Sequence, residues 1–100
     1  MPRPIQPRQT ACDPKALYFK PRGIPLSQLE EENLGLDEME ALRLADLEGL
    51  YHAKAAEKMG VSRATFGRIL ESARKKVARA LLGGKALKIE EKPNANGYLP

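Results

Sequence analysis

Residues 55–73 read AAEKMGVSRATFGRILESA, and this stretch decides the fold. Apolar residues before Gly60 lie at helical spacing, and a second helical pattern begins just after it. Glycine tolerates a positive φ and commonly ends a helix, while Ser62 is a favourable N-cap. The stretch therefore predicts two helices joined by a tight turn.

The second of these helices is expected to be long. Its apolar residues recur at steps of three and four, namely Phe66, Ile69, Leu70, Ala73, Val77, Ala80 and Leu81. The pattern runs on to Gly83-Gly84, which predicts a helix of about 20 residues and roughly 30 Å. A helix-turn-helix also needs a small residue where its helices cross and a turn that accepts positive φ. Ala56 and Gly60 meet these demands, so a helix-turn-helix over about residues 51–82 is predicted.

Outward from this unit, Asp37 and Glu40 form a capping box that predicts a first helix over about residues 38–47. A short second helix is expected before Gly60, with Ala53, Ala55, Ala56 and Met59 on its buried side. Another capping box, Ser27 with Glu30, predicts a single helical turn. Residues 17–20 and 86–90 have strand-like sequences and can pair with each other.

The expected fold is therefore mainly α, a three-helix helix-turn-helix domain with a long third helix and a small two-stranded β element. The expected organisation is a proline-rich basic arm at 1–16, a helix-turn-helix DNA-binding domain at 17–90 and a loose tail at 91–100.

Composition narrows the functional class. The chain has 100 residues, which suits one domain, and only one cysteine and one histidine, Cys12 and His52. These numbers exclude an internal disulfide and a zinc site of soft ligands, and no metal or cofactor is expected. Neither a secretory signal nor an apolar run of membrane-spanning length is present, so a cytoplasmic protein is expected. Without a paired acid and base or an activated nucleophile, the sequence does not predict an enzyme.

Charge is segregated along the chain. Eight carboxylates and one arginine lie between residues 27 and 50, whereas six bases and one carboxylate lie between residues 62 and 79. A helical projection places one outward stripe opposite the apolar face, namely Ala64, Arg68, Ser72, Lys75 and Arg79. A basic helix of this kind is usually just a solvated surface, but here it coincides with the predicted turn and N-cap. The combination favours binding to double-stranded DNA.

The sequence divides the predicted contacts into two sets. The residues expected at the major groove are Ser62, Arg63, Ala64, Thr65, Gly67 and Arg68. The residues expected at phosphates are Lys54, Arg74, Lys75 and Arg79. Either Arg63 or Arg68 can donate two hydrogen bonds to one guanine, which predicts a transcriptional regulator that binds a specific sequence.

Several motifs together resemble the domain of unknown function 134 family of small prokaryotic proteins. They are YFKPRGIPL at 18–26, LDE at 36–38, EALRLAD at 40–46, GVSR at 60–63 and TFGRILE at 65–71. The resemblance covers about residues 17–90 and implies a DNA-binding protein with a helix-turn-helix similar to region four of sigma factors. Two departures are notable: residues 51–54 read YHAK where members usually have a Ser-Gln-Glu-Glu-like run, and Ala64 stands where members often have Gln.

Other interpretations remain open. The acidic first helix can serve as a docking face, which would make the chain an adaptor that contacts RNA polymerase or a redox partner. Its acids also favour the helix dipole, which is the simpler explanation. Cys12 could join a site shared by two copies, although a lone thiol on an arm is simpler. Val77 and Leu81 lie beyond the reach of the shorter helices, so either the segment 17–26 or a second subunit in a homodimer must cover them.

Overall fold

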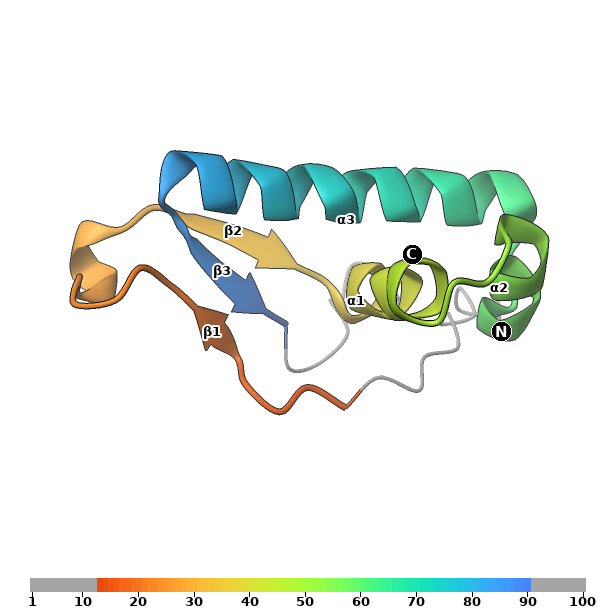
Figure 1. The fold of residues 1–100 in the computed structure, drawn as a ribbon, viewed down its shortest axis with the longest axis horizontal. Helices are drawn as coiled ribbons and strands as arrows, with labels where there is room; N and C mark the ends of the chain where they lie inside the picture. Colours follow the sequence, from red (N-terminus) through yellow and green to blue (C-terminus); the bar gives the residue numbers. More distant parts are fainter. Residues whose placement is uncertain (1–12, 91–100) are drawn as a thin grey trace, which may run out of the picture.

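The computed structural model describes residues 13–90, so Cys12, the tail at 91–100 and most of the predicted arm lie outside the described part. The described part is mainly helical, with a small three-stranded sheet (Figure 1). In chain order its elements are β1 (Tyr18–Phe19), the 3-10 turn η1 (Leu26–Gln28), β2 (Glu31–Leu34), α1 (Leu36–Leu42), the π-helical turn η2 (Arg43–Leu47), α2 (His52–Met59), α3 (Arg63–Gly83) and β3 (Ala86–Ile89).

Helix α3 is the long element against which the others pack. Its C-terminal half lies along the sheet, and its N-terminal half lies along α1 and α2 (Figure 1). The Ser62 side chain accepts a hydrogen bond from the Thr65 backbone nitrogen at 3.1 Å, which confirms the predicted N-cap. Gly84 ends the helix in the left-handed conformation at φ 63°. The predicted length and both predicted ends of this helix are confirmed.

The connection between α2 and α3 is also as predicted. Gly60 follows α2 at φ 68°, and the Val61 nitrogen donates to the Ala56 carbonyl at 3.1 Å. A residue with a Cβ would be strained at that φ, so the turn requires glycine. The predicted buried side of α2 is right for Ala55, Ala56 and Met59 but wrong for Ala53, which is exposed.

The start of the first helix differs from the prediction. Helix α1 begins at Leu36 with Gly35 as its N-cap, and Glu38 accepts a hydrogen bond from the Gly35 nitrogen at 2.8 Å. The predicted box of Asp37 with Glu40 is therefore wrong, because Glu40 instead binds Arg43 at 2.7 Å. After α1 the helix widens into η2, in which the Glu48 nitrogen donates to the Arg43 carbonyl at 2.9 Å.

The sheet has one strand more than expected. As predicted, β1 pairs antiparallel with β3, with Tyr18 opposite Lys88. On its other edge β3 pairs in parallel with β2, which places Glu31 opposite Ala86. The helical turn predicted from Ser27 is only a short 3-10 turn, and the chain then extends into β2. Pairing with β3 overrides the weak local signal of the capping box.

Two apolar clusters lie on either side of α1. The larger, beneath the N-terminal half of α3, contains the largest fully buried side chains, those of Phe66, Leu44, Met59 and Leu70. The smaller contains Leu34, Ala73 and Ile89 and attaches the sheet to α3. The core therefore fixes α2 and the start of α3 as one rigid unit. Within residues 13–90 no helix is both long enough and apolar enough to cross a membrane.

Candidate nucleic-acid interface

The first two turns of α3 combine small side chains with exposed bases. Ser62, Ala64 and Arg68 are exposed, and Gly67 leaves open space where a Cβ would stand. The Arg68 guanidinium donates weakly to the Thr65 hydroxyl at 3.4 Å. Within residues 13–90, neither Arg63 nor Arg68 has a carboxylate partner. All six residues predicted at the groove therefore lie together on one exposed helix end, and its two arginines are available to an anion.

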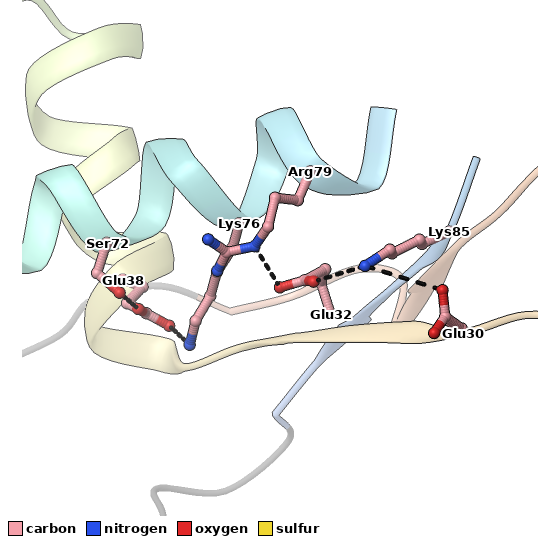
Figure 2. Close-up of polar contacts among 7 residues, drawn as sticks. All are labelled: Glu30, Glu32, Glu38, Ser72, Lys76, Arg79 and Lys85. Atoms are coloured by element: carbon pink, nitrogen blue, oxygen red, sulfur yellow. Dashed lines mark hydrogen bonds and ion pairs between the residues drawn. The ribbon is translucent and has the colours of Figure 1, made fainter. Parts of the chain in front are cut away.

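The later turns of α3 are different, because their bases contact the acidic segment of the same chain (Figure 2). Glu38 accepts hydrogen bonds from the Ser72 hydroxyl at 2.5 Å and from the Lys76 ammonium at 2.8 Å. In β2, Glu32 lies 3.3 Å from the Arg79 Nε and 3.4 Å from the Lys85 Nζ. Lys76 and Arg79 of the basic block are thus paired with carboxylates of the acidic block.

A second connection joins η2 to α3. The Arg74 Nη2 lies 2.5 Å from the Asp46 Oδ1, and its Nε lies 3.1 Å from the Asp46 Oδ2. This two-point hydrogen bond holds the pKa of Asp46 below its ordinary value and raises that of Arg74. For Glu32, partial burial alone would raise the pKa, but hydrogen bonds from Arg79 and Lys85 outweigh it, so that pKa is also lowered.

Each of the four predicted phosphate contacts already has a carboxylate neighbour. Arg74 and Arg79 bind Asp46 and Glu32 as described. Lys54 lies 3.1 Å from Glu57, and Lys75 lies 3.6 Å from Glu71. These two lysine pairs are exposed and join neighbouring turns of one helix, so they are weak and easily exchanged for a phosphate.

The predicted outward stripe is wrong at one position, Ser72, which is half-buried because its hydroxyl donates to the buried Glu38 of α1. Arg79 is exposed, as predicted, although its Nε also reaches Glu32 in β2. Ala64, Arg68 and Lys75 are exposed, as the stripe requires.

A hollow of about 510 Å3 lies beside the start of α2, and Tyr51, His52, Arg63 and Arg74 are among its lining residues. The His52 ring packs edge-on against Phe66, with centroids 5.3 Å apart, so this histidine is half-buried instead of simply solvated. Sequence reasoning did not single out Lys58, an exposed cation in the last turn of α2 without a carboxylate partner in residues 13–90. Its position just before the turn at Gly60 could have identified it from the sequence as a cation close to the start of α3.

The described residues contain no group of three or more His, Cys, Asp or Glu side chains that could hold a metal ion. The exposed end of α3 is a cationic surface with open space at Gly67.

Comparison with known proteins gives consistent matches. A family model described as "Protein of unknown function DUF134" matches residues 1–93. A UPF0251 protein of Dehalococcoides mccartyi is 60% identical over 90 residues, covering 90% of this chain and 77% of the relative. A UPF0251 protein of Desulfosudis oleivorans is 54% identical over 90 residues and covers 90% of this chain, which spans 65% of that relative's length. No solved structure matches.

Proposed function

Since this chain belongs to the DUF134 family, whose description assigns no function, we propose that it is a sequence-specific DNA-binding protein and transcriptional regulator. In this proposal α2, the Gly60 turn and α3 form a helix-turn-helix, and the N-terminal turns of α3 enter the major groove. The protein acts in the cytoplasm on double-stranded DNA and needs no catalytic group.

One observation carries the proposal, namely the uneven pairing of the bases on α3. From Arg74 onward its bases contact carboxylates, whereas Arg63 and Arg68 contact none within residues 13–90. A base held by a carboxylate of another segment gains little from a phosphate, because that carboxylate must first be released, whereas the exposed pairs of Lys54 and Lys75 exchange easily. The unpaired positive charge is therefore concentrated where a helix-turn-helix contacts DNA.

The shape of the same helix end also supports this function. Close approach to base edges requires small side chains, and Ala64 and Gly67 leave the backbone accessible between the arginines. Arg63 and Arg68 are the side chains suited to guanine, through two parallel hydrogen bonds to O6 and N7. Lys54, Lys58 and Lys75 flank this end and can bind phosphates.

The alternative of an adaptor that docks on RNA polymerase through its acidic first helix has less support. Such a surface needs accessible carboxylates, and Glu38 and Glu40 are buried while Asp46 is held by Arg74. The two acids of α1 that are buried, Glu38 and Glu40, contact other residues of the same chain and are not available to a partner.

The test is a binding titration by fluorescence anisotropy on duplex DNA selected from random sequence, repeated over a range of salt concentrations. Arg68→Ala should weaken specific binding by about 1–3 kcal/mol and relax the preference at one base pair. Arg79→Ala is the matched control, because it removes the same side chain from the paired half of α3 and should change affinity much less. An equal loss in both variants would contradict the proposed division, and no duplex affinity at low salt would contradict DNA binding itself.

A further inference from the structure

The hydroxyl of Thr65 lies at the centre of a small hydrogen-bond network at the start of α3. Its Oγ1 accepts a hydrogen bond from the Ser62 hydroxyl at 3.0 Å and another from the Arg68 Nη2 at 3.4 Å. The Ser62 oxygen in turn accepts from the Thr65 backbone nitrogen at 3.1 Å. A hydroxyl oxygen has two lone pairs, so both acceptor positions of Thr65 are occupied. This one side chain therefore links the N-cap of the helix to the Arg68 guanidinium.

The two arginines of this helix end differ in how they are held. Arg63 borders the hollow beside the start of α2 and has no hydrogen-bond partner within residues 13–90. Arg68 lies three residues after Thr65, a spacing at which helical side chains are neighbours. Long side chains on a helix lean toward its N-terminus, so the hydrogen bond to Thr65 reinforces the direction that the helix already favours for Arg68.

We propose that Thr65 is a positioning residue for Arg68 and thereby sets how strongly the protein selects the base pair that Arg68 contacts. This inference rests on the proposed function, in which Arg68 binds guanine. Ordering a flexible side chain at an interface lowers affinity by about two- to tenfold. An arginine that is already held in the unbound protein loses less freedom on binding, so its contact with the correct base is stronger.

The residues around Arg68 leave its guanidinium accessible to DNA. Ala64, one helical turn earlier, is exposed and ends at Cβ, and Gly67 has open space where a Cβ would stand. A guanidinium has several N–H groups, and the hydrogen bond to Thr65 occupies only one of them. Others remain for the two parallel hydrogen bonds to guanine O6 and N7. Thr65 thus directs the Arg68 side chain without using up its capacity to bind a base.

The first test compares Thr65→Val with Thr65→Ser in the anisotropy titration. Valine keeps the shape of threonine and the backbone nitrogen that Ser62 caps but lacks the hydroxyl, whereas serine keeps the hydroxyl. The two duplexes are the selected site and the same site with a substitution at the base pair where Arg68→Ala relaxes the preference. Thr65→Val should lower the ratio of the two affinities by about two- to tenfold without changing the affinity for random duplex, and Thr65→Ser should keep the wild-type ratio.

Double-mutant cycles separate positioning from a direct contact between Thr65 and DNA. In an Arg68→Ala background Thr65→Val should have no further effect, because no guanidinium is left to hold. In an Arg63→Ala background, the matched control, it should keep its full effect. An equal effect of Thr65→Val in both backgrounds would overturn the proposal. An equal loss on the selected and random duplexes would also overturn it, because that result is expected if the Thr65 hydroxyl only contacts a phosphate.

The second test examines the same contact without DNA. NMR relaxation of the arginine Nε–H groups in the full chain should show a smaller amplitude of fast motion for Arg68 than for Arg63. Thr65→Val should bring Arg68 to the level of Arg63, and Thr65→Ser should not. Equal motion of the two arginines in the wild-type protein would overturn the positioning role. The expected NMR difference in a protein without duplex affinity at low salt would refute the proposed function while confirming that Thr65 holds Arg68.

Discussion

Replacing Glu38 with alanine should destabilise this protein more than any other single change to its charged residues. Glu38 is buried, and its carboxylate accepts hydrogen bonds from the Gly35 nitrogen, the Ser72 hydroxyl and the Lys76 ammonium. It thereby caps α1 and joins that helix to α3 at the same point (Figure 2).

The size of this destabilisation follows from the buried groups that lose their partner when the carboxylate is removed. Removing one member of a fully buried ion pair costs about 3–5 kcal/mol, and each buried neutral donor without an acceptor costs about 1–3 kcal/mol. The Lys76 side chain is 27% exposed, so water can solvate part of its charge. We therefore expect Glu38→Ala to lower the free energy of unfolding by about 2–4 kcal/mol, which for a domain of this size lowers the Tm by roughly 10–25 °C. Glu38→Gln keeps an acceptor and should cost about half as much.

The assay is urea unfolding followed by circular dichroism, with thermal melts alongside. Glu31→Gln is the matched control, because Glu31 is an exposed acid of β2 with no partner within residues 13–90, and it should change stability by less than about 0.5 kcal/mol. A double-mutant cycle with Lys76→Met isolates the ion pair. A loss below about 0.5 kcal/mol in Glu38→Ala would refute the reasoning, and so would an absence of coupling to Lys76.

Three further changes have definite expected outcomes. Gly60→Val forces a β-branched residue to φ 68° and should lower the free energy of unfolding by about 1–3 kcal/mol, and with it the Tm. An unchanged Tm would contradict the requirement for glycine in this turn. Phe66→Ala leaves a cavity in the larger apolar cluster and should lower the free energy of unfolding, measured in urea, by about 3–5 kcal/mol. A much smaller decrease would contradict the complete burial of Phe66. Arg74 lowers the pKa of Asp46, so the pairing of these two residues stabilises the fold fully above pH 3.8, the ordinary pKa of an aspartate. This stabilisation is lost as the pH falls through the lowered pKa of Asp46. Asp46→Asn should therefore reduce the loss of stability on acidification below pH 3.8, and an identical acid profile would contradict this assignment.

The local signals in the sequence predicted the helical part of this fold well. Ser62, Gly60 and Gly84 act through the conformation of one or two residues, so their effect can be deduced without knowing the rest of the chain. The apolar spacing from Phe66 to Ala80 likewise reports which face of α3 is buried. The six residues predicted at the groove depend on these same signals and are close in sequence, which is why the structure places all of them at one helix end.

The parts of the fold that the sequence did not predict depend on contacts between segments distant in sequence. Strand β2 reads as a run of charged and polar residues, and only its parallel pairing with β3 makes it a strand. Glu38 looked like an acid that favours the dipole of its own helix, whereas Ser72 and Lys76, which it contacts, lie more than thirty positions later in the chain. The partner of Glu32, Arg79, is just as distant in sequence. The stripe on α3 failed at Ser72 for the same reason, because this residue contacts Glu38 of α1. A helical projection identifies the side opposite the core but not a second layer that covers part of it.

The parallel pairing of β2 with β3 also bears on how the chain folds. It brings Glu31 beside Ala86 and so closes a loop of roughly 50 residues that contains all three helices. That closure loses chain entropy before any strand contact forms, whereas α3 and its turn with α2 depend on neighbours close in sequence. The helices should therefore assemble first, and mutations in β2 should speed unfolding while leaving the refolding rate nearly unchanged. The sheet then forms last, and Glu32 of β2 reaches Arg79 and Lys85 only when it closes.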